Sequence, residues 1–433
     1  MSKVQFQIDE TDGPAQTRAW VLHPDIKNDK NRRSPVPALA EAVALAEALP
    51  NLEVLGAAVV QLRTINAGHL FGKGKIEEIR QQLEEHEVEL VLVDGPVSPV
   101  QQRNLEKAWK VKLLDRTGLI LEIFSDRAAT REGVLQVEMA ALNYQRTRLV
   151  RAWTHLERQR GGFGFVGGPG ETQIESDRRA IDDQLLSLKR QLEKVVKTRA
   201  LHRAARAKIP YPIVALVGYT NAGKSTLFNR LTGAEVFVKD MLFATLDPTM
   251  RSLELLDGPE IILSDTVGFI SDLPTELVAA FRATLEEVLA ADIILHVRDI
   301  SHAETEGQAR DVREILASLG VPDDTTTFEI WNKLDLLPDD LADAMRERAA
   351  RDDTVLAISA LSGEGLDLLQ RTVGQALQGI MRTDEVTLGF AEGRKRAWLF
   401  KQEVVLGETQ TDDGFVITVR WSEEVETAYQ RLK

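Results

Sequence analysis

The sequence predicts an α/β protein in which a parallel sheet flanked by helices follows an α/β unit with a long helical hairpin and precedes a small α+β unit. Three observations predict this: a glycine-rich turn between an apolar strand and a helix, alternating strand-like and helix-like runs before it, and two long heptad-like segments. The 433 residues exceed what one core ordinarily supports. The expected boundaries are 1–115, 116–209 with a glycine-rich tip at 161–170, 210–383 and 384–433.

Composition narrows the class of protein before any motif is considered. No apolar stretch nears the roughly 20 residues of a membrane span, and the first residues lack the basic-then-apolar order of a signal peptide. The sequence has no cysteine, which excludes disulfides, thiolate metal sites and cysteine nucleophiles. We therefore expect a cytoplasmic location, with peripheral association with a membrane as an option.

The net charge of −14 is unevenly distributed along the chain. Residues 144–208 hold 15 Lys and Arg against 7 Asp and Glu, whereas residues 213–383 hold 14 against 29. A basic block therefore lies next to an acidic one, and only the basic block suits a polyanionic partner.

The first part of the chain alternates strand-like and helix-like runs, as a small α/β unit would. These runs are residues 52–60, 74–86, 88–94, 98–109 and 111–115. The stretch FGKGKIEEI (71–79) places glycines before a helix and could bind phosphate, but it lacks a full phosphate-binding pattern, so a plain helix start is preferred. After residue 383, strand-like runs around the turn TDDG (411–414) and a short helix predict the α+β unit.

Two heptad-like apolar seams predict two long helices folded back on each other. The first seam contains Leu135, Met139, Leu142, Leu149, Trp153 and Leu156, and the second contains Ile181, Leu185, Leu188, Leu192 and Val195. GGFGFVGGPG (161–170) separates them and cannot be helical, because glycine loses much backbone entropy and proline lacks a donor. Thr172 and Glu175 match a capping box, which places the start of the second helix near Gln173.

The stretch GYTNAGKS (218–225) follows the apolar run IVALV and precedes a helical run, which is the context of a phosphate-binding loop. The glycines let backbone N–H groups turn toward a phosphate, Lys224 reaches the β- and γ-phosphates, and the Ser225 hydroxyl binds Mg²⁺. An ordinary glycine turn is the alternative. The residues expected to bind nucleotide here are Gly218, Tyr219, Thr220, Asn221, Ala222, Gly223, Lys224, Ser225 and Thr226.

Three downstream segments complete the site and select the base. Asp265 ends a strand-like run where a carboxylate beside magnesium is expected, and Gly268 can offer its N–H to the γ-phosphate. Asp335 can accept the N1–H and N2 amino hydrogens of guanine, a pair that adenine lacks. GTP is therefore expected. The residues concerned are Asp265, Thr266, Val267, Gly268, Asn332, Lys333, Leu334, Asp335, Ser359, Ala360 and Leu361.

The segment between the loop and Asp265 should supply a threonine to magnesium and the γ-phosphate. Thr245 is the first choice and Thr249 the alternate, against the plainer interpretation of an ordinary loop threonine. The residues expected to bind nucleotide here are Phe243, Ala244, Thr245, Leu246 and Asp247. Phe269 stands where the best-known GTPases carry a water-orienting glutamine, so hydrolysis should be slow without a partner and the catalytic residue stays unknown. Residues 273–288 suggest an amphipathic switch helix.

Five segments together resemble the HflX family of translation-associated GTPases over nearly the whole chain: GYTNAGKSTLFNRLT, FATLDPT, DTVGFISDLP, FGKGKIEEI and GGFGFVGGPGETQIE. The resemblance implies a P-loop GTPase domain that hydrolyses GTP with Mg²⁺, binds the large ribosomal subunit and splits stalled ribosomes, often under heat or other stress. It also implies ribosome-stimulated hydrolysis, a hairpin that approaches ribosomal RNA, and ATP binding by the N-terminal region.

The basic excess of the hairpin favours RNA independently of that resemblance. Arginine binds phosphate through a planar fork, and rings among glycines can stack on bases. The residues expected to contact RNA are Arg158, Arg160, Phe163, Phe165, Arg178 and Arg179. A solvated coiled coil is the plainer alternative.

Two other functions stay open on the sequence alone. One is a GTP-dependent ribosome-assembly or RNA-binding factor, and the other is a cytoplasmic scaffold in which the nucleotide is structural. The glycine-rich tip and the arginines disfavour the scaffold, because a protein-binding coiled coil does not need them. Cosedimentation with intact ribosomes and separated subunits distinguishes the three functions.

Overall fold

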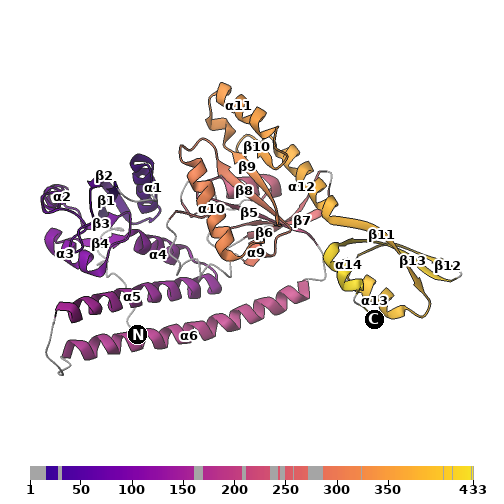
Figure 1. Ribbon diagram of the computed structural model, residues 1–433, viewed down its shortest axis with the longest axis horizontal. Helices are drawn as coiled ribbons and strands as arrows, with labels where there is room; N and C mark the ends of the chain where they lie inside the picture. Colours follow the sequence, from indigo (N-terminus) through magenta and orange to yellow (C-terminus); the bar gives the residue numbers. More distant parts are fainter. Residues whose placement is uncertain are drawn as a thin grey trace. The chain divides into compact units, whose positions relative to one another are not determined.

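The computed structural model describes residues 16–27, 32–159, 169–206, 211–234, 242–243, 249–256, 258–271, 286–322, 324–402, 404–411, 413–430 and 432. The chain divides into two compact units (Figure 1). Unit 1 comprises Met1–Leu192, Lys239–Asp247 and Ser271–Arg282, and unit 2 comprises Glu193–Val238, Pro248–Ile270 and Ala283–Lys433. Two short stretches of the expected GTP-binding region are therefore grouped with unit 1.

A four-stranded parallel sheet lies at the centre of unit 1, in the order β2-β1-β3-β4. The strands are β1 (Thr17–Ile26), β2 (Leu52–Leu62), β3 (Leu90–Val93) and β4 (Lys112–Asp115). The chain places β2 on one side of β1 and then crosses back to place β3 and β4 on the other side. The direction of winding therefore reverses between β1 and β3. The strands expected over 52–60, 88–94 and 111–115 are confirmed, and β1 was missed.

Two pairs of helices cover the sheet of unit 1 (Figure 1). Helix α1 (Pro35–Glu47) contacts α4 (Arg116–Arg127), and α2 (Lys73–Glu85) contacts α3 (Pro99–Trp109). Local polar groups fix two of the helix starts: Ser98 and Gln101 form a capping box at α3, and the Asp115 carboxylate accepts the Gly118 N–H over 2.9 Å at α4. The core between the layers includes Leu22, Phe71 and Trp109.

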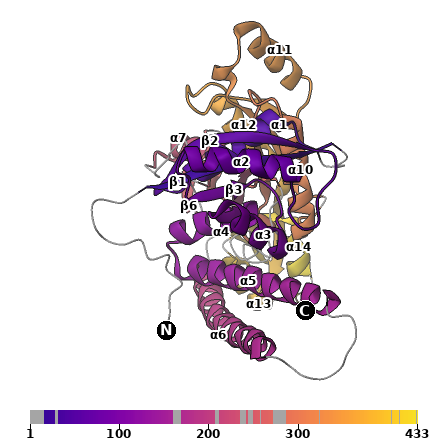
Figure 2. The same ribbon diagram turned by 90° about the vertical axis from the view of Figure 1, so that its left-hand side faces the viewer.

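The expected pair of long helices is confirmed as α5 (Arg131–Gln159) and α6 (Pro169–Arg206). Figures 1 and 2 show α5 beside the part of α6 in unit 1, where Arg146 and Asp182 form an ion pair of 2.8 Å. The expected start near Gln173 is wrong: α6 begins at Pro169, since proline needs no donor in the first turn. Helix α5 contacts α3 and α4, and Leu135, near its start, is buried. Residues 161–168 of the tip lie outside the described ranges.

Unit 2 contains a six-stranded sheet in the order β10-β9-β8-β5-β7-β6, in which only β6 is antiparallel to its neighbour. This arrangement confirms the expected P-loop GTPase fold. The strands are β5 (Ile213–Gly218), β6 (Thr249–Glu254), β7 (Glu260–Asp265), β8 (Ile293–Asp299), β9 (Thr326–Asn332) and β10 (Val355–Ala357). The helical segments are α7 (Lys224–Thr232), α9 (Glu286–Leu289), α10 (Thr305–Leu319), η1 (Leu334–Leu336), α11 (Asp339–Ala349) and α12 (Leu366–Ile380).

The end of the chain forms a three-stranded antiparallel sheet in the order β11-β13-β12. The elements are β11 (Met381–Gly389), α13 (Gly393–Lys401), β12 (Val405–Thr411), β13 (Gly414–Ser422) and α14 (Glu423–Gln430). Leu399, Ile417 and Trp421 belong to its core. The expected strands around TDDG and the short final helix are confirmed. Among the described helices, none combines the length and apolarity needed to cross a bilayer.

Candidate functional site

The loop between β5 and α7 packs tightly against two other segments at the carboxyl edge of the unit 2 sheet. A Cβ on Gly218 would lie 2.2 Å from the carbonyl oxygen of Val297 on β8, and a Cβ on Gly223 would lie 2.2 Å from Nδ2 of Asn332. Gly223 also has a φ of +92°, in the left-handed region that favours glycine. Both glycines are therefore required by the close approach of neighbouring segments, and not only by the turn.

Lys224 is buried at the start of α7, with 6% of its surface exposed. Its Nζ donates to the carbonyl oxygens of Gly218 (3.1 Å) and Tyr219 (2.9 Å), so the loop closes around the ammonium group. Burial lowers the pKa of Lys224 to about 8, against the opposing effect of the Asp265 carboxylate. Negatively charged phosphate oxygens at this position would stabilise the charged form.

Ser225 and Asp265 meet where α7 starts and β7 ends. The Ser225 hydroxyl donates to Oδ2 of Asp265 over 2.7 Å, and Asp265 is fully buried. Hydroxyl and carboxylate oxygens suit Mg²⁺, which usually keeps its other positions for water and phosphate oxygens. Over the described ranges, no cluster of three or more His, Cys, Asp or Glu could hold a metal on its own. These residues therefore fit magnesium bound together with a nucleotide.

The segment after β7 runs along the phosphate loop. The Thr220 N–H donates to the Phe269 carbonyl oxygen over 2.7 Å, and the Phe269 N–H donates to the Gly218 carbonyl oxygen over 3.1 Å. These bonds form an isolated parallel bridge between Tyr219 and Phe269. The Phe269 ring is 3% exposed and carries no polar atom, so it cannot orient a water molecule.

Asn332 joins the phosphate loop to the segment that follows β10. Its Nδ2 donates to the Ala222 carbonyl oxygen over 2.8 Å, and its Oδ1 accepts the Ala360 N–H over 2.9 Å. Asp335 is exposed, and its Oδ1 accepts the Ser359 hydroxyl over 2.5 Å. One carboxylate oxygen is thus held in place while the group stays accessible to a base.

Lys333 lies between Asn332 and Asp335 in the sequence, and its backbone φ of +68° is in the left-handed region. Its Nζ forms an ion pair of 2.8 Å with Asp299, the last residue of β8. Sequence reasoning missed Asp299. Its signal was its position, because a carboxylate at the end of the strand-like run IILHVRD reaches the same sheet edge as Asp265.

Several residues expected at the GTP site or in RNA contacts are not placed among the groups above. Phe243 is buried in unit 1 against Phe124 of α4, with ring centroids 4.6 Å apart, and its carbonyl oxygen accepts a hydrogen bond from Arg127. Arg178 and Arg179 are exposed on α6. The remaining expected residues lie outside the described ranges or have no described side chain: Arg158, Arg160, Phe163, Phe165, Ala244, Thr245, Leu246 and Asp247.

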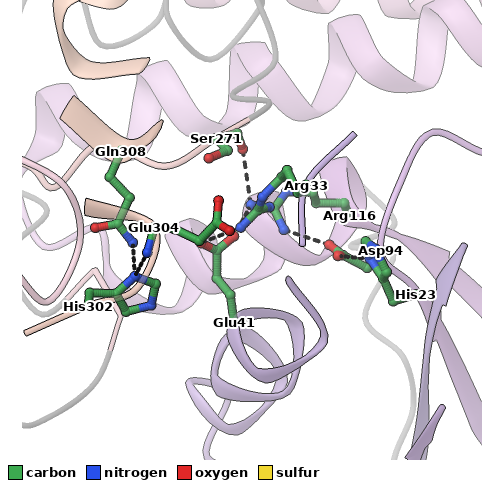
Figure 3. A network of polar contacts seen from close by, with 9 residues as sticks. All are labelled: His23, Arg33, Glu41, Asp94, Arg116, Ser271, His302, Glu304 and Gln308. Carbon is green, nitrogen blue, oxygen red and sulfur yellow. Dashed lines mark hydrogen bonds and ion pairs between the residues drawn. The ribbon is translucent and has the colours of Figure 1, made fainter. Parts of the chain in front are cut away.

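A buried ion-pair network in unit 1 was not expected from the sequence (Figure 3). Arg116 pairs with Asp94 (2.5 Å) and Glu41 (2.6 Å) and also donates to the Ser271 carbonyl oxygen (3.0 Å). Burial raises the pKa of Asp94, but Arg116 and His23 outweigh it and hold that pKa at about 2. The network borders a cavity of about 500 Å³ at the carboxyl ends of β1, β3 and β4.

Comparison with known proteins assigns the chain to a family. Residues 37–125, 127–206, 213–333 and 344–432 match the family models described as GTP-binding GTPase N-terminal, GTP-binding GTPase middle region, 50S ribosome-binding GTPase and HflX C-terminal domain. The GTPase HflX of Magnetococcus marinus is 48% identical over 400 residues, which cover 92% of this chain and 90% of that protein. This chain belongs to the HflX family of GTPases.

Two further relatives with more than 30% identity agree with this assignment. The GTPase HflX of Escherichia coli is 43% identical over 80% of this chain and 81% of that protein, and the putative GTP-binding protein 6 of Xenopus laevis is 36% identical over 90% and 74%. A solved GTP-binding protein from Sulfolobus solfataricus in complex with GDP is 24% identical, covers 84% of this chain and 99% of that chain, and has a TM-score of 0.43. The expected family and the expected GTPase activity are confirmed.

Proposed function

We propose that this HflX GTPase binds the large ribosomal subunit in the cytoplasm and splits stalled ribosomes under heat or other stress. Residues 213–333 match a family model described as a 50S ribosome-binding GTPase. The observation that carries the proposal is that the same chain joins this GTP-binding fold directly to the long basic helix α6. A nucleotide-controlled domain is thereby connected to an element suited to RNA.

The hairpin supports a contact with ribosomal RNA. Helix α6 has 38 residues, which at 1.5 Å per residue makes it roughly 57 Å long. Arg178 and Arg179 are exposed near its start, and the closest Arg178–Asp182 approach is 4.0 Å, too long to neutralise the guanidinium strongly. Phosphate oxygens can therefore reach this end of α6.

The GTP site supports hydrolysis that is slow alone and stimulated by the ribosome. The Phe269 side chain has no polar atom that could bind water, and the Phe269 backbone is hydrogen-bonded to Gly218 and Thr220 of the phosphate loop. A partner that rearranges the site or contributes a group to it can order the attacking water in trans. Ser225 and Asp265 would hold Mg²⁺, which would supply positive charge to offset the negative charge of the phosphates.

Cosedimentation with ribosomes tests the proposal. Full-length protein with a non-hydrolysable GTP analogue should pellet with isolated large subunits, and GDP should weaken that binding. A factor for ribosome assembly or RNA would instead bind precursor particles or free RNA and leave mature large subunits in the supernatant. A scaffold with a structural nucleotide would bind neither, whichever nucleotide is present.

ATP binding by the N-terminal region is a second candidate function, favoured by the cavity of unit 1. It lies beside the point where the winding of a parallel sheet reverses, the usual ligand position in such sheets, and Arg32, Arg33 and Arg148 contribute to its lining. A fluorescent ATP analogue should bind the protein in the presence of saturating GDP. Replacing Arg32 and Arg33 with alanine should weaken that binding, and equal affinity in the variant would exclude the cavity.

A further inference from the structure

Hydrolysis of GTP needs a polar group that orders the attacking water, and Phe269 cannot be that group. Several other side chains around the phosphate loop carry a hydroxyl. Ser225 donates to Asp265 (2.7 Å), Thr266 donates to the Leu216 carbonyl oxygen (2.6 Å), and Ser359 donates to Asp335 (2.5 Å). Each of these hydroxyls already has a protein partner.

Thr220 differs from these residues. It is the third residue of the loop and is 6% exposed, and its Oγ1 is buried with no hydrogen-bond partner within the described part of the chain. A buried hydroxyl without a partner destabilises the state that contains it. The hydroxyl of Thr220 therefore does not stabilise the folded loop, and its presence needs a different explanation.

The neighbours of Thr220 are the groups expected to grip the γ-phosphate. A Cβ placed on Gly268 would lie 2.8 Å from Cγ2 of Thr220, 2.9 Å from its Cα and 3.1 Å from Nζ of Lys224. The side chains of Thr220 and Lys224 thus approach the Gly268 backbone at one point. A rotation of about 120° around the Cα–Cβ bond to another staggered rotamer would bring Oγ1 of Thr220 to the present position of its methyl group.

We propose that Thr220 is a catalytic residue that orders the attacking water in place of the missing glutamine. Its hydroxyl donates to a γ-phosphate oxygen and accepts a hydrogen bond from the water. The water oxygen forms a bond to the γ-phosphorus, the bond from that phosphorus to the β–γ bridging oxygen breaks, and its electron pair leaves with GDP. The proton of the water passes to a γ-phosphate oxygen, so Thr220 gains and loses no proton.

A packing role is the competing explanation, because the Thr220 methyl group lies 2.8 Å from the position that a Cβ on Gly268 would occupy. Valine separates the two explanations, since it keeps the shape and the methyl contact of threonine but has no hydroxyl. Serine provides the matched control, because it keeps the hydroxyl and loses the methyl group. The inference extends the GTPase activity of the chain and does not depend on any ribosomal contact.

Single-turnover hydrolysis of saturating GTP by the isolated full-length protein tests the inference, with GDP affinity measured in parallel. T220V should hydrolyse GTP roughly 10- to 100-fold more slowly than the parent protein, as expected when one hydrogen bond to a charged group is lost in the transition state. T220S should stay within about threefold of the parent rate, and both variants should bind GDP within about twofold of the parent.

Hydrolysis by T220V within twofold of the parent rate would overturn the inference, as would an equal loss of rate in T220S and T220V. If T220V fails to bind GDP, T220A replaces it in the same comparison with T220S. Because ribosomes are absent from this assay, its outcome leaves the proposed ribosomal function to be judged separately.

Discussion

Asn332 holds the Ala222 carbonyl oxygen at 2.8 Å through its side-chain amide, although the two residues are 110 positions apart in the sequence. The same side chain accepts the Ala360 N–H over 2.9 Å. One buried amide thereby sets the spacing between the phosphate loop and the two segments expected to bind the base. We therefore expect phosphate binding and base recognition to be coupled through this group.

Replacing Asn332 with alanine should weaken GTP and GDP binding together. The substitution leaves the Ala222 carbonyl and the Ala360 N–H without their partner, at a cost of about 1–3 kcal/mol, or roughly 5- to 150-fold in affinity. Titration of a fluorescent guanine nucleotide measures the change. Asn104→Ala is the matched control, since its amide also donates to a backbone carbonyl oxygen, that of Gly68, but in unit 1. Equal losses in both variants would contradict the coupling.

Asp335→Asn should exchange the preferred base from guanine to xanthine. The variant loses a charge-assisted pair of hydrogen bonds to guanine, at roughly 2–4 kcal/mol, and gains a donor for the C2 carbonyl of xanthine. Competition between GTP and xanthosine triphosphate measures the exchange. Asp340→Asn, an exposed position in α11, should change neither affinity. Unchanged GTP affinity in Asp335→Asn would remove this residue from the base site.

GTP affinity should fall as the pH rises through 8. Burial holds the pKa of free Lys224 at about 8, and bound phosphates favour the ammonium form, so its pKa is higher in the complex. Between those two pKa values, binding takes up a proton, and affinity drops by up to about tenfold per pH unit. Calorimetry in buffers of different ionisation enthalpy should find most of a proton taken up at pH 8.5 and little at pH 7. The same uptake in Lys224→Arg would assign the proton to another group.

Most of the candidate GTP site could be predicted from short sequence motifs. Glycines at 218 and 223, the serine at 225 and the amide at 332 are required by contacts that any loop of this kind must make, so a short pattern identifies them. The strands and helices of unit 1 between residues 52 and 115 were predictable for a different reason, namely the regular change of hydrophobic period between strand and helix.

Features built from distant residues could not be predicted in the same way. Strand β1 was missed because His23, Pro24 and Asp25 interrupt its apolar run and conceal it as a turn. The Arg116 network joins residues 22 and 75 positions apart, and neither separation forms a pattern. The hydroxyl of Thr220 differs from that of Thr266 only in its surroundings, which the sequence does not contain.

Binding of the hairpin to ribosomal RNA should depend steeply on salt. Neutralising phosphates releases counterions, so removing arginines should flatten the plot of log affinity against log salt by about 0.7–0.9 for each phosphate that the variant no longer neutralises. The variant replaces Arg158, Arg160, Arg178 and Arg179 with alanine. The control variant replaces four exposed arginines of unit 2: Arg251, Arg310, Arg351 and Arg382.

Cosedimentation with large subunits over a range of salt concentrations measures both slopes. The hairpin variant should have the flatter slope, and the control variant should keep the parent slope. GTP affinity should hardly change with salt in any of the proteins, because the nucleotide is held in a closed local site. Identical slopes for the two variants would mean that the expected hairpin arginines do not contact RNA phosphates.

Light scattering by intact ribosomes tests the central claim most directly, because splitting a ribosome into subunits lowers the scattered intensity. Full-length protein with a GTP analogue should lower the signal, whereas a variant lacking residues 162–168 should still bind large subunits but leave the signal unchanged. That pair of results would identify the tip as the element that splits ribosomes. Large-subunit binding by the parent protein with no fall in scattering would contradict the proposed splitting activity, and equal splitting by the tip deletion would show that the tip only connects the two helices.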